Sequence, residues 1–553
     1  MTPCMQKVLK VHPDDNLIVA LQDLTAGDQV SLDGETFILV SPTSAKHKFA
    51  AVQLNQGDAV VMYGVLVGRA MQPIQRGEVI TTFNLKHAAS TPVIRESDYQ
   101  WTPPRVDRFA NRTFNGFHRS DGKVGIANYW IIIPLVFCEN RNIDMLRELL
   151  VEKLGYHKPK SFGLDVDKLV QRYQQGASAS SFLTEDVLLN GTDASSERIF
   201  KNVDGIKFLR HDGGCGGTRQ DSNALCALLA GYVNNANVAG ATVLSLGCQN
   251  AQVKTFEDAV KKINPAFDKP LYIIGQQESK SEPEFIADAV RKTFAGLVQA
   301  NECTRTPAPI GKLIVGLECG GSDGFSGISA NPVLGYFSDM LTALNGSPVL
   351  SEFPELNGVE QNLVDRSVSQ PVAEKFVHLM KRYQESAVKV GSGFDMNPSP
   401  GNIKDGLITD AMKSAGAAKK GGTSPVVDVL DYTEQIGGPG LHLLCTPGND
   451  VESTTAMAGS GCTLILFTTG LGTPTGNPIA PTIKVSSNSK LSQRMHDVID
   501  IDTGPIITGE ATIESKATEL MEYALQVASG EIMPHAVRLQ QDDFIPWKRG
   551  VSL

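Results

Sequence analysis

Short runs that alternate between apolar and polar residues fill the first part of the chain, from about residue 5 to 90. Residues 17–21 and 36–40 are two of these runs, and turn-forming Asp-Gly and Gln-Gly-Asp sequences separate them from their neighbours. Alternation with a period of two is typical of strands that bury one face. The pattern predicts a small all-β domain, of the β-clip or barrel type, over residues 1–95.

Further along, the apolar runs become continuous, and each ends in a polar turn. These runs cover residues 241–246, 313–317, 441–445 and 463–467. Continuous runs favour strands buried on both faces of a parallel sheet, and ligands bind at the carboxyl ends of such strands. With helices expected over 282–299 and 511–528, the pattern predicts a large α/β region with parallel, Rossmann-like sheets. If the strands share one rim, their polar tips face one pocket.

The division of this region follows changes in composition. Residues 96–125 are rich in Pro, Arg, Ser and Asn with little periodicity, which indicates a linker. An α/β domain is predicted over 126–395, including a polar surface excursion over 156–196. A loop over 391–406 contains Asn-Pro-Ser-Pro-Gly-Asn, so a C-terminal α/β domain is predicted over 396–553.

Two glycine-rich turns carry the strongest chemical signal. Residues 316–331 read Gly-Leu-Glu-Cys-Gly-Gly-Ser-Asp-Gly-Phe-Ser-Gly-Ile-Ser-Ala-Asn, and the segment from His211 to Asp221 contains Cys215 and Arg219 among glycines. Glycine lets backbone approach a ligand without a Cβ in the way. A plain connector would not need a histidine, a cysteine and an arginine within so few residues, so both turns are predicted to bind a ligand.

Composition narrows the class of ligand. The 553 residues suggest roughly two to four domains. A net charge of −10 without long charged runs argues against nucleic acid or anionic membranes as partners, and favours a small molecule. The N-terminus lacks the apolar core of a secretory signal and no run is long enough to span a membrane, so a cytoplasmic protein is expected. Symmetric self-association is the default expectation for a soluble enzyme.

The nine cysteines point to reduced thiols. Their number is odd, and several lie in glycine-rich turns, which suits metal binding or chemistry better than a disulfide framework. A nucleotide-binding protein is disfavoured, because the chain lacks Gly-x-x-x-x-Gly-Lys-Ser/Thr. A non-catalytic sensor, which would bind a sugar acid without converting it, is the alternative outside the enzymes.

These residues together resemble the altronate/galactarate dehydratase family, whose β-clip is of the SAF type. The resemblance covers nearly the whole chain and rests on these segments: His47-Lys48 with Gly64, 247–250, 316–332, 397–402, 446–450 and 470–474. It implies a hydro-lyase of sugar-acid catabolism that converts an aldonic or aldaric acid to a 2-keto-3-deoxy acid with a divalent metal, ferrous iron first and Mn²⁺ second. D-altronate going to 2-keto-3-deoxy-D-gluconate is the leading expectation, and galactarate or a sulfonated hydroxy acid that loses sulfite are the alternatives.

One segment departs from that pattern. Where the family carries Val-His-x-His-Asn, this chain has Ile-Thr-Thr-Phe-Asn over residues 80–84, so Thr81 and Phe83 replace two imidazoles. His87 is then the nearest substitute.

Dehydration of a 2,3-dihydroxy acid requires a base at C2, an acid for the leaving C3 hydroxyl and a cation for the enediolate charge. We predict His211 and His47 as base and acid, between the β-clip and the α/β region. Four residues are predicted to bind the metal: His87, Cys215, Cys248 and Cys319. An iron–sulfur centre is the alternative, ranked second because no Cys-x-x-Cys is present. The predicted substrate contacts are Lys48, Arg219, Asn250, Ser322, Asp323, Asn449, Asp450 and Lys484.

Overall fold

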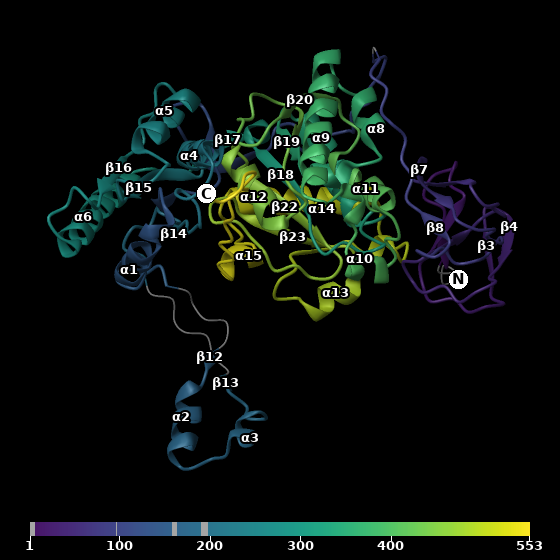
Figure 1. The fold of residues 1–553 in the computed structure, drawn as a ribbon, viewed down its shortest axis with the longest axis horizontal. Coiled ribbons are helices and arrows are strands. Elements are labelled where there is room, and N and C mark those ends of the chain that lie inside the picture. Colours follow the sequence, from purple (N-terminus) through teal and green to yellow (C-terminus); the bar gives the residue numbers. More distant parts are fainter. Residues whose placement is uncertain (1–5, 96, 158–162, 190–196) are drawn as a thin grey trace.

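Three units follow one another in the computed structural model, which describes residues 6–95, 97–157, 163–189 and 197–553 (Figure 1). The first is the β-clip domain, with antiparallel sheets β1-β2-β5, β3-β4 and β6-β7-β8. Its strands are β1 (Val8–Leu9), β2 (Leu17–Ala20), β3 (Gln29–Leu32), β4 (Glu35–Ile38), β5 (Lys48–Ala50), β6 (Ala59–Met62), β7 (Val65–Ala70) and β8 (Leu85–Lys86). The predicted all-β start of the chain is confirmed.

The middle unit is built on a parallel sheet of order β14-β11-β15-β16. Its strands are β11 (Tyr129–Pro134), β14 (Gly205–Phe208), β15 (Val238–Ser245) and β16 (Leu271–Gly275). The helices are α1 (Asn140–Val151), α4 (Arg219–Asn234), α5 (Val253–Ile263) and α6 (Glu282–Ala300). Every residue of β11 and β15 is buried, as the continuous apolar runs predict for strands covered on both faces.

Two smaller pieces accompany the middle unit. An antiparallel sheet combines β9 (Thr113–His118), β10 (Val124–Gly125) and β17 (Thr306–Pro309) beside the larger sheets. The predicted surface excursion contains α2 (Val166–Gln174), α3 (Ala179–Phe182) and the hairpin of β12 (Gly163–Leu164) and β13 (Leu188–Leu189). This piece lies apart from the parallel sheets in Figure 1.

The main unit contains a seven-stranded parallel sheet of order β20-β21-β19-β18-β22-β23-β24. Its strands are β18 (Ile314–Cys319), β19 (Ser347–Leu350), β20 (Val426–Leu430), β21 (Leu441–Leu444), β22 (Leu464–Thr469), β23 (Thr482–Ser486) and β24 (Ile501–Asp502). The α-helices are α7 (Ala330–Ala343), α8 (Glu360–Asp365), α9 (Gln370–Lys389), α10 (Pro400–Lys404), α11 (Asp410–Ala417), α12 (Asp450–Gly459), α13 (Ser489–Arg494), α14 (Ile513–Ala528) and α15 (His535–Arg538). Short 3₁₀ turns are η1 (Phe137–Glu139), η2 (Ile310–Lys312), η3 (Phe353–Leu356), η4 (Phe394–Met396), η5 (Ala418–Gly421) and η6 (Gly504–Ile506).

This sheet takes strands from both sides of residue 395, so the domain division predicted there does not separate two sheets. β18 and β19 precede that residue, and β20 to β24 follow it. The polar loop that suggested a boundary belongs to the long connection from β19 to β20, which also contains α8 to α11. The change from one parallel sheet to the other lies between β16 and β18. Local amino-acid composition does not reveal the order of strands within a sheet.

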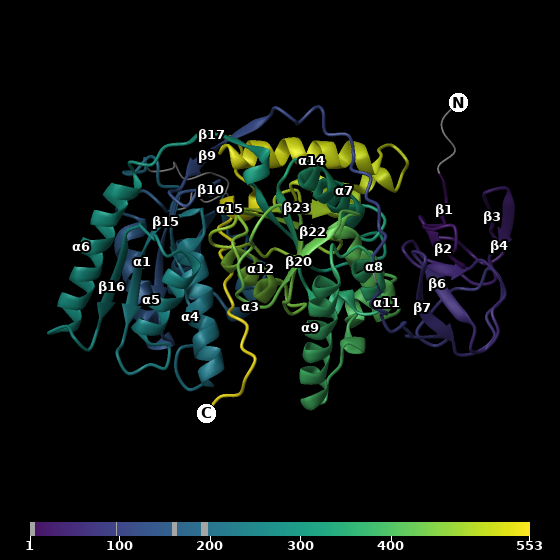
Figure 2. The same ribbon diagram turned by 90° about the horizontal axis from the view of Figure 1, so that it is seen from above.

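Figure 2 shows the main unit between the other two. One buried apolar cluster joins β-clip residues such as Val67 to Ile408 and Ala411 of the main unit, and a second joins Leu228 of the middle unit to Met457. Helices α4 and α12 pack closely because Gly231 has no side chain: a Cβ there would lie 1.9 Å from the carbonyl oxygen of Gly459. The three units therefore share cores and hold the strand ends in fixed positions.

The C-terminal tail, residues 539–553, runs between the middle and main units (Figure 2). Gly476 N donates to the Asp543 carboxylate at 3.0 Å, and Trp547 N donates to the Tyr432 hydroxyl at 2.9 Å. Arg549 N then donates to Asp221 at the start of α4, at 2.9 Å. The tail thus connects the carboxyl-end loops of both parallel sheets.

Candidate active site

Buried ionisable groups gather at the carboxyl ends of the seven-stranded sheet. We name this group the acidic centre; it comprises Glu318, Cys319, Glu352, Glu355 and Asp450 with Lys413, Lys420 and Lys484. Glu318 and Cys319 end β18, Glu352 follows β19, and Asp450 begins α12 after β21. Parallel strands bring their carboxyl ends to one edge, so residues more than a hundred positions apart in the sequence become neighbours.

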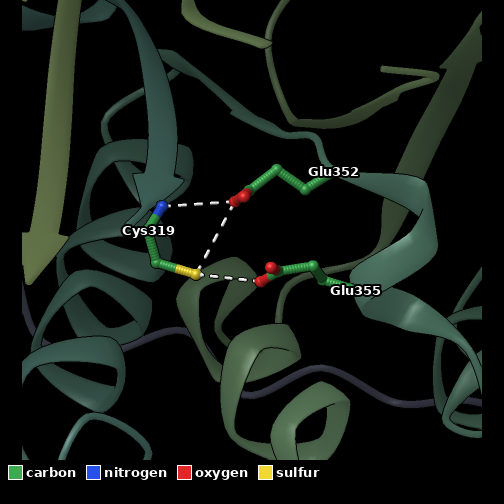
Figure 3. A group of neighbouring side chains, drawn as sticks. All are labelled: Cys319, Glu352 and Glu355. Carbon is green, nitrogen blue, oxygen red and sulfur yellow. Dashed lines mark hydrogen bonds between the residues drawn. The ribbon is translucent and has the colours of Figure 1, made fainter. Parts of the chain in front are cut away.

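Cys319 lies between two carboxylates (Figure 3). Its Sγ is 3.3 Å from Glu355 Oε2 and 3.6 Å from Glu352 Oε2, and its backbone N donates to Glu352 at 3.2 Å. Burial, followed by the charge of Glu352, raises the pKa of the Cys319 thiol well above its ordinary value. The sulfur is therefore a protonated donor to Glu355 in this arrangement.

Two lysines balance the negative charge. Lys420 Nζ donates to Glu352 Oε2 at 2.6 Å and to Cys319 Sγ at 2.8 Å, and Lys413 Nζ donates to Glu355 Oε1 at 2.6 Å. Burial works against the charge on Lys420, but the acidic groups around it raise its pKa well above the usual range. Such buried pairs are stable only while both partners are present.

Glu318, Glu352 and Asp450 form a second group whose ligand atoms all lie within 4.8 Å of one another. Ser453 donates to Glu318 Oε2 at 2.6 Å, yet Glu318 Oε1 and Glu352 Oε1 are buried without a hydrogen-bond partner. Three carboxylates with two unpartnered oxygens fit a divalent cation that prefers oxygen ligands. These residues could hold the metal that the sequence led us to expect.

Asp450 and Lys484 have unusual proton affinities. Burial, then the charges of Glu352 and Glu355, raises the pKa of Asp450 to about 7. Burial lowers the pKa of Lys484 to about 7, and its Nζ lies 3.2 Å from the centre of the Phe467 ring. Groups that titrate near neutral pH are suited to acid and base catalysis.

The β-clip residues of the prediction lie against the main unit beside this centre. His47 Nε2 lies 3.0 Å from the carbonyl oxygen of Lys404, and the buried Lys48 donates to the carbonyl oxygen of Gly406 at 2.7 Å. Burial lowers the pKa of Lys48 to about 7. Both side chains therefore contact the loop after α10.

Ser322 and Asp323 lie in the turn that follows β18. Both are buried; Ser322 accepts from Asn402 through its backbone oxygen at 2.7 Å, and Asp323 accepts from Ser487 Oγ at 2.8 Å. Lys46 of the β-clip domain pairs with Asp323 at 3.0 Å. Asp323 is thus fully engaged in joining the turn to its neighbours.

His87 and Asn449 contact helix starts. His87 Nδ1 accepts from Ala411 N at 3.3 Å in α11, and burial lowers its pKa. The Asn449 side chain accepts from Val451 N and Glu452 N, both at 3.1 Å, and so caps α12. The cap holds Asp450 at the first position of that helix.

The remaining predicted residues lie at the carboxyl end of the four-stranded sheet in the middle unit. His211 is buried and both ring nitrogens meet backbone: Nε2 lies 2.7 Å from Pro134 O, and Nδ1 accepts from Gly213 N at 3.1 Å. Burial lowers the pKa of His211, so it is a neutral imidazole protonated on Nε2. Cys215, Arg219, Cys248 and Asn250 are exposed on the same edge.

The predicted metal ligands thus occupy three places. Cys215 and Cys248 lie on the middle unit, Cys319 in the acidic centre and His87 beside α11. Among the described residues, the groups of close ligand atoms do not combine these four. Cys319 ends β18, whereas Cys215 and Cys248 lie in the loops after β14 and β15, so the three cysteines follow strands of two different sheets.

A cavity of about 1160 Å³ lies between the middle unit, the main unit and the C-terminal tail. Val451, next to Asp450, lines it from the main unit, and Arg210, next to His211, lines it from the middle unit. The other cationic residues of its wall are Arg147, Arg198, Lys201, Lys207 and Arg538. Four acidic residues also line the cavity, Glu197, Asp204, Asp542 and Asp543, and Lys207 pairs with Asp542 at 2.7 Å. The cationic side chains thus only modestly outnumber the acidic ones, which would weakly favour a negatively charged substrate there.

Five members of the acidic centre were not among the residues predicted from the sequence: Glu318, Glu352, Glu355, Lys413 and Lys420. Glu352 and Glu355 follow β19 in the segment Ser-Glu-Phe-Pro-Glu, and acidic residues directly after an apolar run are a signal that could have been used. Lys413 and Lys420 arrive from α11 and η5. Nothing in the sequence around those two lysines marks them.

Models of known families match the chain in three parts. The model for the C-terminal part of D-galactarate/altronate dehydratase matches residues 310–552. The model for the second domain of D-galactarate dehydratase/altronate hydrolase matches residues 116–301. The model for the altronate/galactarate dehydratase SAF domain matches residues 6–88. An altronate dehydratase of Bacillus subtilis strain 168 is 32% identical over 99% of this chain and 100% of its own length. This chain belongs to the altronate/galactarate dehydratase family.

Other members of this family are similar at comparable levels. An altronate dehydratase of Escherichia coli K12 is 33% identical over 95% of both chains, and a galactarate dehydratase (L-threo-forming) of the same organism is 29% identical over 95% of this chain and 93% of its own. Membership confirms the resemblance read from the sequence and makes the protein a sugar-acid dehydratase, a hydro-lyase. No helix in the described parts of the chain has the length and apolar character needed to cross a bilayer.

Proposed function

We propose that this dehydratase converts D-altronate to 2-keto-3-deoxy-D-gluconate and water at the acidic centre. Support for altronate comes from the two altronate dehydratases, which are 32% and 33% identical to this chain, against 29% for the galactarate enzyme. The observation that carries the proposed chemistry is the presence of Asp450 and Lys484 in one buried centre, each with a pKa of about 7.

Glu318 and Glu352 would hold a divalent cation, with ferrous iron or Mn²⁺ as the candidates, which leaves the neighbouring Asp450 carboxyl free to carry a proton. Such a cation supplies Lewis-acid stabilisation of negative charge on the substrate, worth several kcal/mol. The unpartnered oxygens of Glu318 and Glu352 are the ligand atoms that the protein leaves free for it.

Two proton transfers remain for side chains. In its neutral form Lys484 takes the C2 proton of the acid, and in its protonated form Asp450 gives a proton to the C3 hydroxyl, which leaves as water. The enol that results becomes the 2-keto-3-deoxy acid when C3 is protonated. At neutral pH both groups have substantial populations of the required form, because each pKa is about 7.

His211 and His47 are the alternative base and acid. In the present arrangement His211 has both ring nitrogens occupied by Pro134 and Gly213, so it would first have to break one of these contacts. His47 keeps only partial burial, with Nε2 at the Lys404 carbonyl. This pair and the Asp450–Lys484 pair make different predictions for single substitutions.

Galactarate is the second candidate substrate, and one observation favours it. The cavity wall carries cationic groups on both the middle unit and the tail side, for example Arg147 and Arg538. A diacid has a carboxylate at each end and would use two such contacts, whereas altronate ends in a neutral hydroxymethyl group. The assay must therefore compare the two acids directly.

The test is an anaerobic assay of purified protein supplied with ferrous iron or Mn²⁺, with D-altronate, galactarate and a sulfonated hydroxy acid presented separately. We expect the 2-keto-3-deoxy product from D-altronate, with a higher kcat/KM than from galactarate. Turnover of galactarate alone would overturn the altronate assignment while keeping the dehydratase. Loss of turnover in His211→Ala but full activity in Lys484→Met would overturn the proposed acid and base.

A further inference from the structure

Three exposed cysteines lie at the carboxyl ends of neighbouring strands in the middle unit. Cys138 follows β11, Cys215 follows β14 and Cys248 follows β15, and the sheet order places β14, β11 and β15 side by side. None of the three is in a disulfide. We name this group the thiol edge; the altronate chemistry proposed above does not use it.

The backbone ties the three cysteine loops together. Phe137 N donates to Gly213 O at 3.0 Å, and Asn250 N donates to Gly214 O at 2.8 Å. Gly214 makes this contact possible, because its φ of +96° lies in the left-handed region and a Cβ there would come within 2.1 Å of Leu135 O. The loop that carries Cys215 is therefore held directly against the loops that carry Cys138 and Cys248.

Each loop leads directly into a helix. α1 begins at Asn140, α4 at Arg219 and α5 at Val253, so every cysteine lies a short step before a helix N-terminus. The partial positive charge of a helix N-terminus favours negatively charged groups nearby, and an iron–sulfur centre held by thiolates brings negative charge. Arg219 adds a full positive charge at the first position of α4.

In the described residues the three sulfurs are not as close together as a single ion requires. A tetrahedral ion with bonds of about 2.3 Å to sulfur needs its thiolates about 3.8 Å apart. Within the described residues, the groups whose ligand atoms all lie within 4.8 Å of one another do not include Cys138, Cys215 and Cys248. An iron–sulfur cluster is larger than one ion and accepts thiolates that are farther apart.

We propose that Cys138, Cys215 and Cys248 bind a [4Fe–4S] cluster through three thiolates. The nearby His211 does not supply a fourth protein ligand, because both of its ring nitrogens meet backbone groups. One iron is then open to an outside ligand. Cys215 lines a cavity of about 310 Å³ with Asp221, Trp547 and Lys548, which gives a small oxygen-containing anion room to reach that iron.

The test measures iron and acid-labile sulfide after anaerobic purification and anaerobic reconstitution with ferrous iron and sulfide. We expect about four iron and four sulfide per chain, with a Mössbauer spectrum of a cubane cluster. Cys138→Ser, Cys215→Ser and Cys248→Ser should each lose most of the sulfide, while Cys303→Ser, whose half-buried thiol contacts Arg119, keeps it. Circular dichroism checks that each variant is folded.

Iron without sulfide would overturn the proposal in favour of a single thiolate-bound ion. Full sulfide in Cys138→Ser would also overturn it, since this residue is one of the three proposed ligands. A cation in the acidic centre does not confuse the result, because it brings no sulfide and its binding depends on Glu318. The readout is independent of turnover, so failure of the cluster and failure of the altronate assignment are separate outcomes.

Discussion

The acidic centre and the thiol edge both lie at carboxyl ends of parallel strands, but they are held in opposite ways. The acidic centre is buried and depends on side-chain pairs, such as Lys420 with Glu352 at 2.6 Å. The thiol edge is exposed and depends on backbone hydrogen bonds between its loops, such as Asn250 N to Gly214 O. The carboxyl ends of parallel strands can therefore be held in place by side-chain ion pairs or by backbone hydrogen bonds. Side-chain substitutions should affect the two regions differently.

The largest expected effect is on turnover, through Lys484. In Lys484→Met the proposed base is gone, and kcat should fall by on the order of 10²–10⁴, the usual contribution of a positioned proton acceptor. Lys490→Met, which removes an exposed lysine of α13, is the matched control and should keep its activity. Steady-state assays of both variants decide the point. Near-normal turnover of Lys484→Met would move the proton chemistry away from the acidic centre.

The next effect is on stability. Lys420→Met leaves Glu352 buried without its partner, so the free energy of unfolding should fall by about 3–5 kcal/mol in urea titrations. Adding Glu352→Gln should recover part of the loss, because the unpaired charge is then gone. Cys138→Ser at the thiol edge should change the free energy of unfolding of the metal-free protein by less than about 1 kcal/mol. Equal losses in Lys420→Met and Cys138→Ser would contradict the contrast between the two regions.

A pH-dependent effect should follow at Asp450. Its pKa is raised from 3.8 to about 7 in the folded protein, so the folded state loses stability relative to the unfolded chain as pH rises between those values. The difference of about three units corresponds to up to about 4 kcal/mol. Asp450→Asn should therefore stabilise the metal-free protein at pH 8 but have little effect at pH 4, as measured by urea unfolding in EDTA. An equal change at both pH values would refute this origin.

The smallest effect concerns protons released by a cation. Burial raises the pKa values of Glu318 and Glu352, so these carboxyls hold protons that a divalent ion must displace. Calorimetry of Mn²⁺ binding at pH 6.5, in buffers with different ionisation enthalpies, should report release of about one proton per ion. Glu318→Gln should weaken the binding and reduce the release. Heats that do not depend on the buffer would exclude these carboxyls as the ligands.

The sequence predicted the type of each domain and its buried strands better than the way in which the strands combine into sheets. Short strand-like runs between turns, such as 17–21, and continuous apolar runs such as 241–246 identified the β-clip and the buried strands, because each pattern reflects local burial. The prediction that Cys319, Asp450 and Lys484 lie near one another depended on the assumption that all buried strands end at one common edge. In the structure the run at 241–246 belongs to a different sheet from the run at 313–317, and strand order carries no local signal.

Two lysines of the acidic centre show why the sequence did not predict the whole site. Lys413 and Lys420 come from a helix and a 3₁₀ turn that no glycine-rich motif marks, and only the tertiary fold brings them to Glu355 and Glu352. His211 shows that a motif also leaves the contacts of its residues undetermined. Its place beside Cys215 suggests chemistry, yet Pro134 O and Gly213 N occupy its ring nitrogens through contacts that composition does not reveal.

The C-terminal tail has a consequence for the order in which the protein matures on the ribosome. Leu553 N donates to Gly216 O at 2.8 Å, and Arg549 N donates to Asp221, so the loop that carries Cys215 meets partners that are translated more than 300 residues after it. The strands of the middle unit emerge much earlier, by residue 275. At 5–20 residues per second, that loop stays without these partners for on the order of ten seconds to a minute. During that interval a nascent chain exposes the thiol to cellular oxidants and metals before the tail covers its neighbours.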